Sequence, residues 1–300
     1  MLNIFFGKKY IYELPPGHRF PIAKYELVME QLLHEGYVRE ESIVDPGVAD
    51  FEQVSLTHTA EYWNKLQQKT LTSAETRRIG LPIHDKSVAW ASNAAAGAIE
   101  AALYALENGV GLSLAGGTHH AYAGHGEGFC ILNDVAVAAN FILHSKLARK
   151  ILIVDLDVHQ GNGTAALFAG NPHVFTFSMH CAENYPMVKE KSDWDIPLTS
   201  RMQDNEYLSI LKDALARLPG LFAPDLVFYI AGVDVLHTDA LGKLSLSKQG
   251  CRNRDEMVLG FCRDAGIPAV VAMGGGYSPK ISDIVDAHSA TFKTAIDMFH

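Results

Sequence analysis

Cysteine, proline and basic residues are all scarce in this sequence. Its 300 residues include 4 Cys and 12 Pro, and 25 Lys and Arg stand against 34 Asp and Glu, giving a net charge of -9. Four widely spaced cysteines exclude a disulfide framework or a C-x-x-C zinc clip and favour a reducing compartment, the cytoplasm, with the nucleus open for a eukaryotic protein. Few prolines and 48% hydrophobic residues exclude a disordered chain. The lack of clustered cations argues against direct nucleic-acid binding.

Long hydrophobic runs are missing as well. The apolar start at residues 2–6 is shorter than the core of a signal peptide, and later apolar runs have the length of strands. We therefore expect neither a leader nor a membrane partner. The sequence contains no internal repeat, low-complexity tract or linker, so we predict one domain over residues 1–300 and no particular oligomeric state.

Short apolar runs alternate with amphipathic segments along the chain. Runs rich in β-branched residues predict buried strands at residues 112–114, 151–154, 174–177, 226–230 and 268–272. Helical periodicity predicts helices at residues 22–35, 86–107, 206–218 and 255–265, and residues 186–197 are expected to form a long charged loop. This alternation is typical of right-handed crossovers, so we predict an α/β fold with a single open parallel sheet flanked by helices.

Polar residues follow several of these strands, at the edge where open parallel sheets bind ligands. Asp155, Asp157 and His159 alternate with apolar residues, which places their side chains on one side of an extended chain. Together with Asp234, after another strand, they offer the mixed donors of a zinc site, and iron accepts the same set. An Asp after a strand is otherwise often a helix N-cap, but three ionisable groups at a buried strand end need a counter-charge.

Two further features accompany the acidic strand ends. His119 and His120 stand side by side between glycine pairs, where a ligand can approach the backbone closely; in isolation, such a pair would be an ordinary surface feature. Tyr277 follows three glycines at residues 274–276. Its hydroxyl is a candidate donor to developing negative charge, and the alternative is a tyrosine packed on the sheet edge.

The tandem histidines, the D-x-D-x-H segment at residues 155–159, Asp234 and the GGGY segment at residues 274–277 together resemble the zinc-dependent histone deacetylase family. The class IV and bacterial branch of that family is the most similar. The resemblance implies the arginase/deacetylase fold and an amidohydrolase that removes an acetyl or longer acyl group. Its substrate would be an acylated lysine in a protein or peptide, or another small N-acyl amine.

The resemblance also implies a role for each matching residue. Zn²⁺ would be bound by Asp157, His159 and Asp234, with Fe²⁺ as the alternative metal. His120 would be the general base, with Asn162 as its orienting partner, while His119 would pair with Asp155 and Tyr277 would donate to the substrate carbonyl. The substrate channel would be formed by Gly128, Phe129, Tyr185 and Leu241. A structural K⁺ would be held by Asp155, Asp157, His159, Ser178 and Met179.

Departures from the family pattern keep alternatives open. Asn162 and Gly80 each stand where class I members carry Asp, and Leu241 stands where polyamine-selective relatives carry Glu. The carboxylate at that last position would attract a cationic polyamine, so its absence disfavours an acetylpolyamine amidohydrolase without removing it. A binuclear manganese ureohydrolase of the same fold and a non-catalytic acyl-binding sensor are the other two alternatives.

Overall fold

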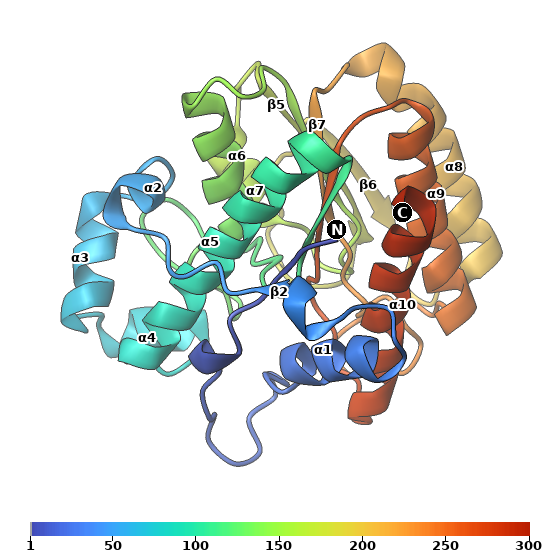
Figure 1. Ribbon diagram of the computed structural model, residues 1–300. Helices are drawn as coiled ribbons and strands as arrows, with labels where there is room; N and C mark the ends of the chain where they lie inside the picture. Colours follow the sequence, from blue (N-terminus) through green and yellow to red (C-terminus); the bar gives the residue numbers. More distant parts are fainter. Residues whose placement is uncertain (1) are drawn as a thin grey trace.

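An eight-stranded parallel sheet forms the centre of the computed structural model, which describes residues 2–300 (Figure 1). Every pair of neighbouring strands is parallel. Across the sheet the order is β2 (Ile43–Val44), β1 (Ile4–Phe5), β3 (Val110–Ser113), β8 (Ala269–Ala272), β7 (Leu226–Ile230), β4 (Ile151–Asp155), β5 (Val174–Cys181) and β6 (Trp194–Leu198).

Helices cover both faces of the sheet (Figure 1). One face carries α5 (Asp85–Asn108), α6 (Asp134–His144) and α7 (Asn162–Phe168). The other carries α1 (Lys24–His34), α8 (Asp204–Leu221), α9 (Lys248–Asp264) and α10 (Ile281–Phe299). Three short helices lie to one side, namely α2 (Phe51–Ser55), α3 (Ala60–Gln68) and α4 (Ser73–Ile79). Two 3₁₀ turns, Lys8–Tyr10 and Glu40–Ser42, complete the elements.

The covered sheet explains the continuous apolar runs in the sequence. Every residue of β4, β7 and β8 is buried, as required when helices pack on both faces of a parallel sheet. The predicted parallel α/β architecture is therefore confirmed. Because β3, β8, β7 and β4 are consecutive neighbours, the segments that follow them emerge together at one edge.

The structure corrects three details of the sequence prediction. Residues 186–197 do not form a loop throughout, because β6 begins at Trp194; Pro197 is tolerated there since β6 is an edge strand paired only with β5. Helix α9 begins at Lys248 instead of residue 255, after Ser247 caps it by accepting a hydrogen bond from the Gly250 N–H. The two-residue strands β1 and β2 are too short to produce a periodic signal.

No helix within residues 2–300 is both long and apolar enough to cross a membrane. All four cysteines, Cys130, Cys181, Cys251 and Cys262, are buried free thiols.

Candidate active site

The three predicted metal ligands meet at the carboxyl ends of β4 and β7. Asp157 and His159 follow β4, and Asp234 follows the adjacent β7. All three side chains are buried, and one ligand atom from each lies within 4.8 Å of the others. His159 Nδ1 is 3.0 Å from Asp157 Oδ1 and 3.2 Å from Asp234 Oδ2. This is the one cluster of its kind found within residues 2–300.

Asp234 carries a carboxylate oxygen that the protein leaves without a hydrogen bond. Its Oδ1 accepts from the Val158 N–H at 2.9 Å, whereas the buried Oδ2 has no hydrogen-bond partner among the described residues. His159 Nδ1 lies 3.2 Å from this oxygen but does not form a hydrogen bond with it. An orphaned buried carboxylate oxygen is costly, and a cation satisfies it. The donor set of two carboxylates and one imidazole therefore fits a single zinc or iron ion.

Gly275 closes the cluster from the segment after β8. Its N–H donates to Asp157 Oδ2 at 2.7 Å. A Cβ at this position would lie 2.0 Å from Asp234 Oδ2 and 2.7 Å from Asp157 Oδ2. Only glycine lets the backbone approach both carboxylates this closely, which explains one residue of the glycine run before Tyr277.

Negative charge dominates the cluster. Burial raises the pKa of Asp234 to about 7, and the charge of Asp157 acts in the same direction. For His159, burial lowers the pKa, but the nearby carboxylates of Asp157 and Asp234 outweigh burial and raise the pKa to about 10. The two carboxylates thus require a positive charge between them. Either a proton on His159 or a metal ion supplies it.

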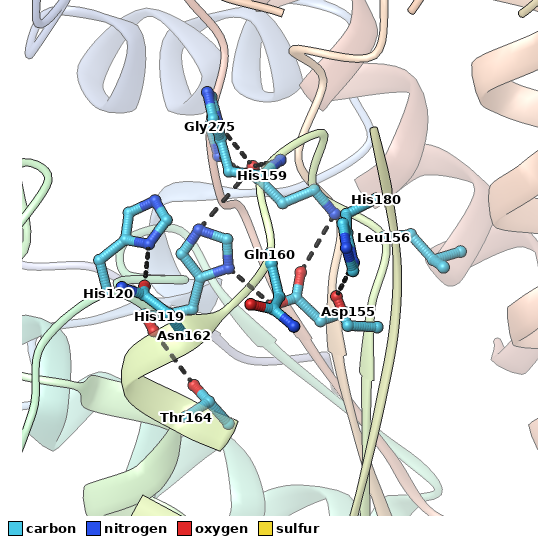
Figure 2. Close-up of polar contacts among 12 residues, drawn as sticks. His119, His120, Asp155, Leu156, His159, Gln160, Asn162, Thr164, His180 and Gly275 are labelled. Atoms are coloured by element: carbon cyan, nitrogen blue, oxygen red, sulfur yellow. Dashed lines mark hydrogen bonds and ion pairs between the residues drawn. The ribbon is translucent and has the colours of Figure 1, made fainter. Parts of the chain in front are cut away.

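His119 and His120 lie beside the cluster on the segment after β3 (Figure 2). His119 Nδ1 is 2.6 Å from Asp155 Oδ2, and His120 Nδ1 is 2.6 Å from Asn162 Oδ1. Their ring centroids are 4.1 Å apart. Carboxylate and amide oxygens only accept, so each histidine donates through Nδ1.

The two histidines differ in charge. Burial lowers the pKa of His119, but Asp155 and Asp157 outweigh it and raise the pKa to about 9. For His120, burial and then the charges of His119 and His159 lower the pKa well below its usual value. Near neutral pH the pair therefore consists of an imidazolium, His119, beside a neutral imidazole, His120.

A cavity of about 440 Å³ opens over these groups. Its inner end is lined by His120, His159 and Tyr277. Farther out, its lining includes all four predicted channel residues, Gly128, Phe129, Tyr185 and Leu241. The Tyr185 ring stands edge-on to His120, with centroids 5.1 Å apart and an interplanar angle of 87°.

The residues predicted for potassium are also near one another. Asp155, the last residue of β4, is the register partner of Ser178 on β5. Met179, next along β5, is fully buried. Ser178 Oγ lies 3.0 Å from His180 Nδ1, a contact that the sequence analysis did not predict.

Sequence reasoning missed two supports of the site, one buried and one half-buried. Lys24 Nζ donates to the Gly274 carbonyl at 2.8 Å, and burial lowers its pKa to about 8. Its spacing with Val28 and Leu32 on the apolar face of α1 is a signal that could have revealed it. Asp239 accepts from the Tyr277 N–H at 2.6 Å, and no local pattern marks it.

Comparisons with known proteins identify the family of this chain. The histone deacetylase domain family matches residues 18–292. An uncharacterized protein of Picosynechococcus sp. is 44% identical over 290 residues, covering 97% of each chain. Histone deacetylase 2 of Arabidopsis thaliana is 30% identical over 277 residues, which cover 89% of this chain and 72% of that protein.

A solved structure shares the fold. The crystal structure of an HDAC homolog from Aquifex aeolicus superposes with a TM-score of 0.82 at 22% identity, covering 98% of this chain and 84% of that one. The family match spans most of the chain, and the Arabidopsis relative reaches 30% identity. The chain therefore belongs to the histone deacetylase domain family.

Proposed function

We propose that this protein is a metal-dependent deacylase that removes an acetyl or longer acyl group from a lysine side chain or another small N-acyl amine. One observation carries the proposal: His120, His159 and Tyr277 line the same cavity, with the other two ligands beside His159 and His119 beside His120. Asp157, His159 and Asp234 would hold Zn²⁺ or Fe²⁺. Such a cation acts as a Lewis acid toward the amide carbonyl and brings the pKa of water down toward ~7.

His120 is the general base of the proposed reaction. It is neutral and donates through Nδ1, so its Nε2 is free to accept a proton from the attacking water. As the amide C–N bond breaks, the same nitrogen returns that proton to the leaving amine. His119, charged and paired with Asp155, stabilises negative charge beside the reacting carbonyl.

Tyr277 is the proposed donor to the carbonyl oxygen. Burial raises the pKa of its hydroxyl well above the usual value, and the charges of Asp157 and Asp234 act in the same direction, so the group keeps its proton. The carbonyl of Gly128 would accept the substrate N–H, and the rings of Phe129 and Tyr185 would enclose the apolar stem of an acyl-lysine. Leu241 adds an apolar wall to the same channel.

The outer cavity favours an anionic over a cationic substrate. Its lining includes the cations Arg19, Arg77, Arg78 and Lys243 but one acid, Glu183. All three arginines are exposed, and they form no ion pair with any described residue. In a chain of net charge -9 this local excess of cations repels acetylpolyamines and attracts acyl-lysines flanked by carboxylates.

Two further parts of the proposal concern ions and location. K⁺ would be held beneath the ligand cluster by Asp155 at the end of β4, by Asp157 and His159 after it, and by Ser178 and Met179 of β5. The cytoplasm is the proposed compartment, because all four cysteines are free thiols and a reducing environment preserves them.

A substrate panel tests the function. Purified protein is assayed with acetyl-lysine peptides, long-chain acyl-lysine peptides and acetylpolyamines, before and after chelation and after Zn²⁺ or Fe²⁺ is added back. We expect hydrolysis of acyl-lysine that chelation abolishes and metal restores. Turnover of none of these substrates by metal-loaded protein would contradict the proposal and favour a non-catalytic acyl-binding sensor.

Matched peptides test the charge preference. At low salt, we expect kcat/KM to be about tenfold higher for acidic than for basic flanks, and the ratio should shrink as salt screens the rim. The double variant Arg77→Gln/Arg78→Gln should lose most of this ratio. Faster hydrolysis of acetylpolyamines than of acidic acyl-lysine peptides would overturn the assignment.

A further inference from the structure

Glu127 occupies a distinctive position between the channel wall and the catalytic base. It directly precedes Gly128, and its side chain is only 18% exposed. Its Oε1 accepts a hydrogen bond from Asn162 Nδ2 at 3.0 Å and another from the Tyr185 hydroxyl. One carboxylate oxygen thus joins the partner of His120 to the wall of the cavity.

The amide of Asn162 has two unlike ends, and the protein has to select one of them for His120. With Oδ1 toward His120, the amide accepts from Nδ1. Turned over, its NH₂ group would donate to Nδ1 instead, and the ring proton would have to sit on Nε2. A histidine in that tautomer has no free Nε2 lone pair and cannot take a proton from water.

Glu127 provides the selection. An ionised carboxylate only accepts, so the NH₂ end of Asn162 is favoured toward Glu127 and the oxygen end toward His120. The Tyr122 hydroxyl supports the same orientation, since it accepts from Asn162 Nδ2 at 3.1 Å while donating to Glu190 Oε1 at 3.2 Å. A carboxylate at residue 162 would need no such help, because both its oxygens accept.

We propose that Glu127 is a positioning residue that fixes the amide of Asn162 and, through it, the tautomer of His120. The inference rests on the proposed function insofar as His120 is the base. It adds a structural requirement: with an amide at position 162, this chain needs an acceptor behind that amide.

Kinetics of Glu127 variants test the inference. Glu127→Ala should lower kcat by about tenfold or more with KM within about twofold, the range seen when outer partners of an active site are removed. Glu127→Gln, which keeps an amide oxygen at the same place, should recover most of the lost kcat. An equal loss of kcat in both variants would contradict positioning through an acceptor.

A second substitution supplies the matched control. Asn162→Asp alone places two carboxylates about 3 Å apart and should be strongly impaired, since like charges at that distance repel. Asn162→Asp/Glu127→Gln removes the repulsion and the need for orientation, so it should be faster than Asn162→Asp by about tenfold. Additive effects of the two substitutions would overturn the proposal, and this test holds even if Glu127→Ala fails to fold.

A spectroscopic readout separates this inference from the proposed function. The ¹⁵N chemical shifts of the His120 ring report which nitrogen carries the proton, with or without turnover. We expect an Nδ1–H tautomer in the unsubstituted protein and a gain of Nε2–H in Glu127→Ala. Unchanged shifts would refute the positioning role, whereas the expected shifts in a protein without deacylase activity would refute the proposed function alone.

Discussion

Two buried groups of charges in this protein are built in opposite ways, one on helix α9 and the other at the carboxyl ends of β4 and β7. Arg254 and Asp255, on α9, are both 0% exposed. Arg254 Nε and Nη2 donate to Asp255 Oδ1 at 2.9 and 2.8 Å. The remaining Asp255 oxygen accepts from Thr291 Oγ1 at 2.6 Å. The ligand cluster instead holds two carboxylates, one of which has an oxygen without a hydrogen bond.

The contrast separates a structural ion pair from an ion-binding site. In the Arg254 pair, charges cancel and donors meet acceptors, so nothing further is required. In the cluster, the negative charge of two carboxylates and the carboxylate oxygen without a hydrogen bond require a cation. The two are also connected, because Arg254 Nη1 donates to the Gly232 and Leu156 carbonyls at 2.6 and 3.2 Å, within the segments that present Asp234 and Asp157.

Removing a ligand should produce the largest effect. We expect Asp234→Asn to lower kcat/KM by about 10⁴-fold, the scale of losing a member of a catalytic unit. Without metal, the variant should be no less stable than the metal-free unsubstituted protein, because Asn keeps the oxygen for the Val158 N–H while the repulsion from Asp157 disappears. Activity assays and denaturant unfolding check the two parts. A large loss of stability would place this cluster in the same class as the Arg254 pair.

Breaking the Arg254–Asp255 ion pair should have the opposite effect, lowering stability while leaving activity in place. Arg254→Met leaves Asp255 buried and unpaired, so we expect the free energy of unfolding to fall by about 3–5 kcal/mol. Denaturant unfolding measures it, and Asp255→Asn is a companion that leaves Arg254 unpaired. Because all three ligands remain, metal-loaded protein that stays folded should retain activity. A stable but inactive, metal-free variant would show that the pair serves the site more than the fold.

Tyr277→Phe addresses a group that neither binds the metal nor stabilises the core by charge. Loss of one donor to a developing oxyanion costs ~10²–10³ in turnover, or roughly 3–4 kcal/mol. We expect kcat to fall by that factor with metal content and unfolding unchanged. Turnover close to that of the unsubstituted protein would remove Tyr277 from the mechanism.

The smallest and most gradual effect should come from His58. This buried, neutral side chain forms hydrogen bonds through both of its ring nitrogens. Its Nδ1 donates to the Tyr122 carbonyl at 2.9 Å, and its Nε2 accepts from the Asn133 N–H at 3.0 Å. Burial lowers its pKa to about 4. Between that value and the unfolded value near 6.5 the unfolded chain binds more protons, so stability falls as pH falls through this window.

The pH dependence of unfolding measures this contribution. From pH 7 to pH 5, the unsubstituted protein should lose about 2 kcal/mol more than His58→Gln, whose side chain is neutral throughout. Equal losses in the two proteins would mean that His58 is protonated in the folded state or that its surroundings open.

The sequence predicted the ligand cluster better than its supports. Asp157 and His159 alternate with apolar residues directly after β4, so a local pattern indicated that they lie close together, and the end of β7 gave the place of Asp234. Glu127 and Asp239 act through contacts 35 and 38 residues away along the chain, and no local pattern records such distances. The edge strand β6 was missed because its exposed proline and its half-buried positions hide the alternation of a buried strand.

Metal stoichiometry tests the contrast between the two charge groups most directly. Elemental analysis of the purified protein, beside Asp234→Asn and Arg254→Met, measures how many ions each chain holds. We predict one zinc or iron ion per chain in the unsubstituted protein and in folded Arg254→Met, with most of that metal lost in Asp234→Asn. Two ions per chain, or full metal content in Asp234→Asn, would contradict a single site formed by Asp157, His159 and Asp234.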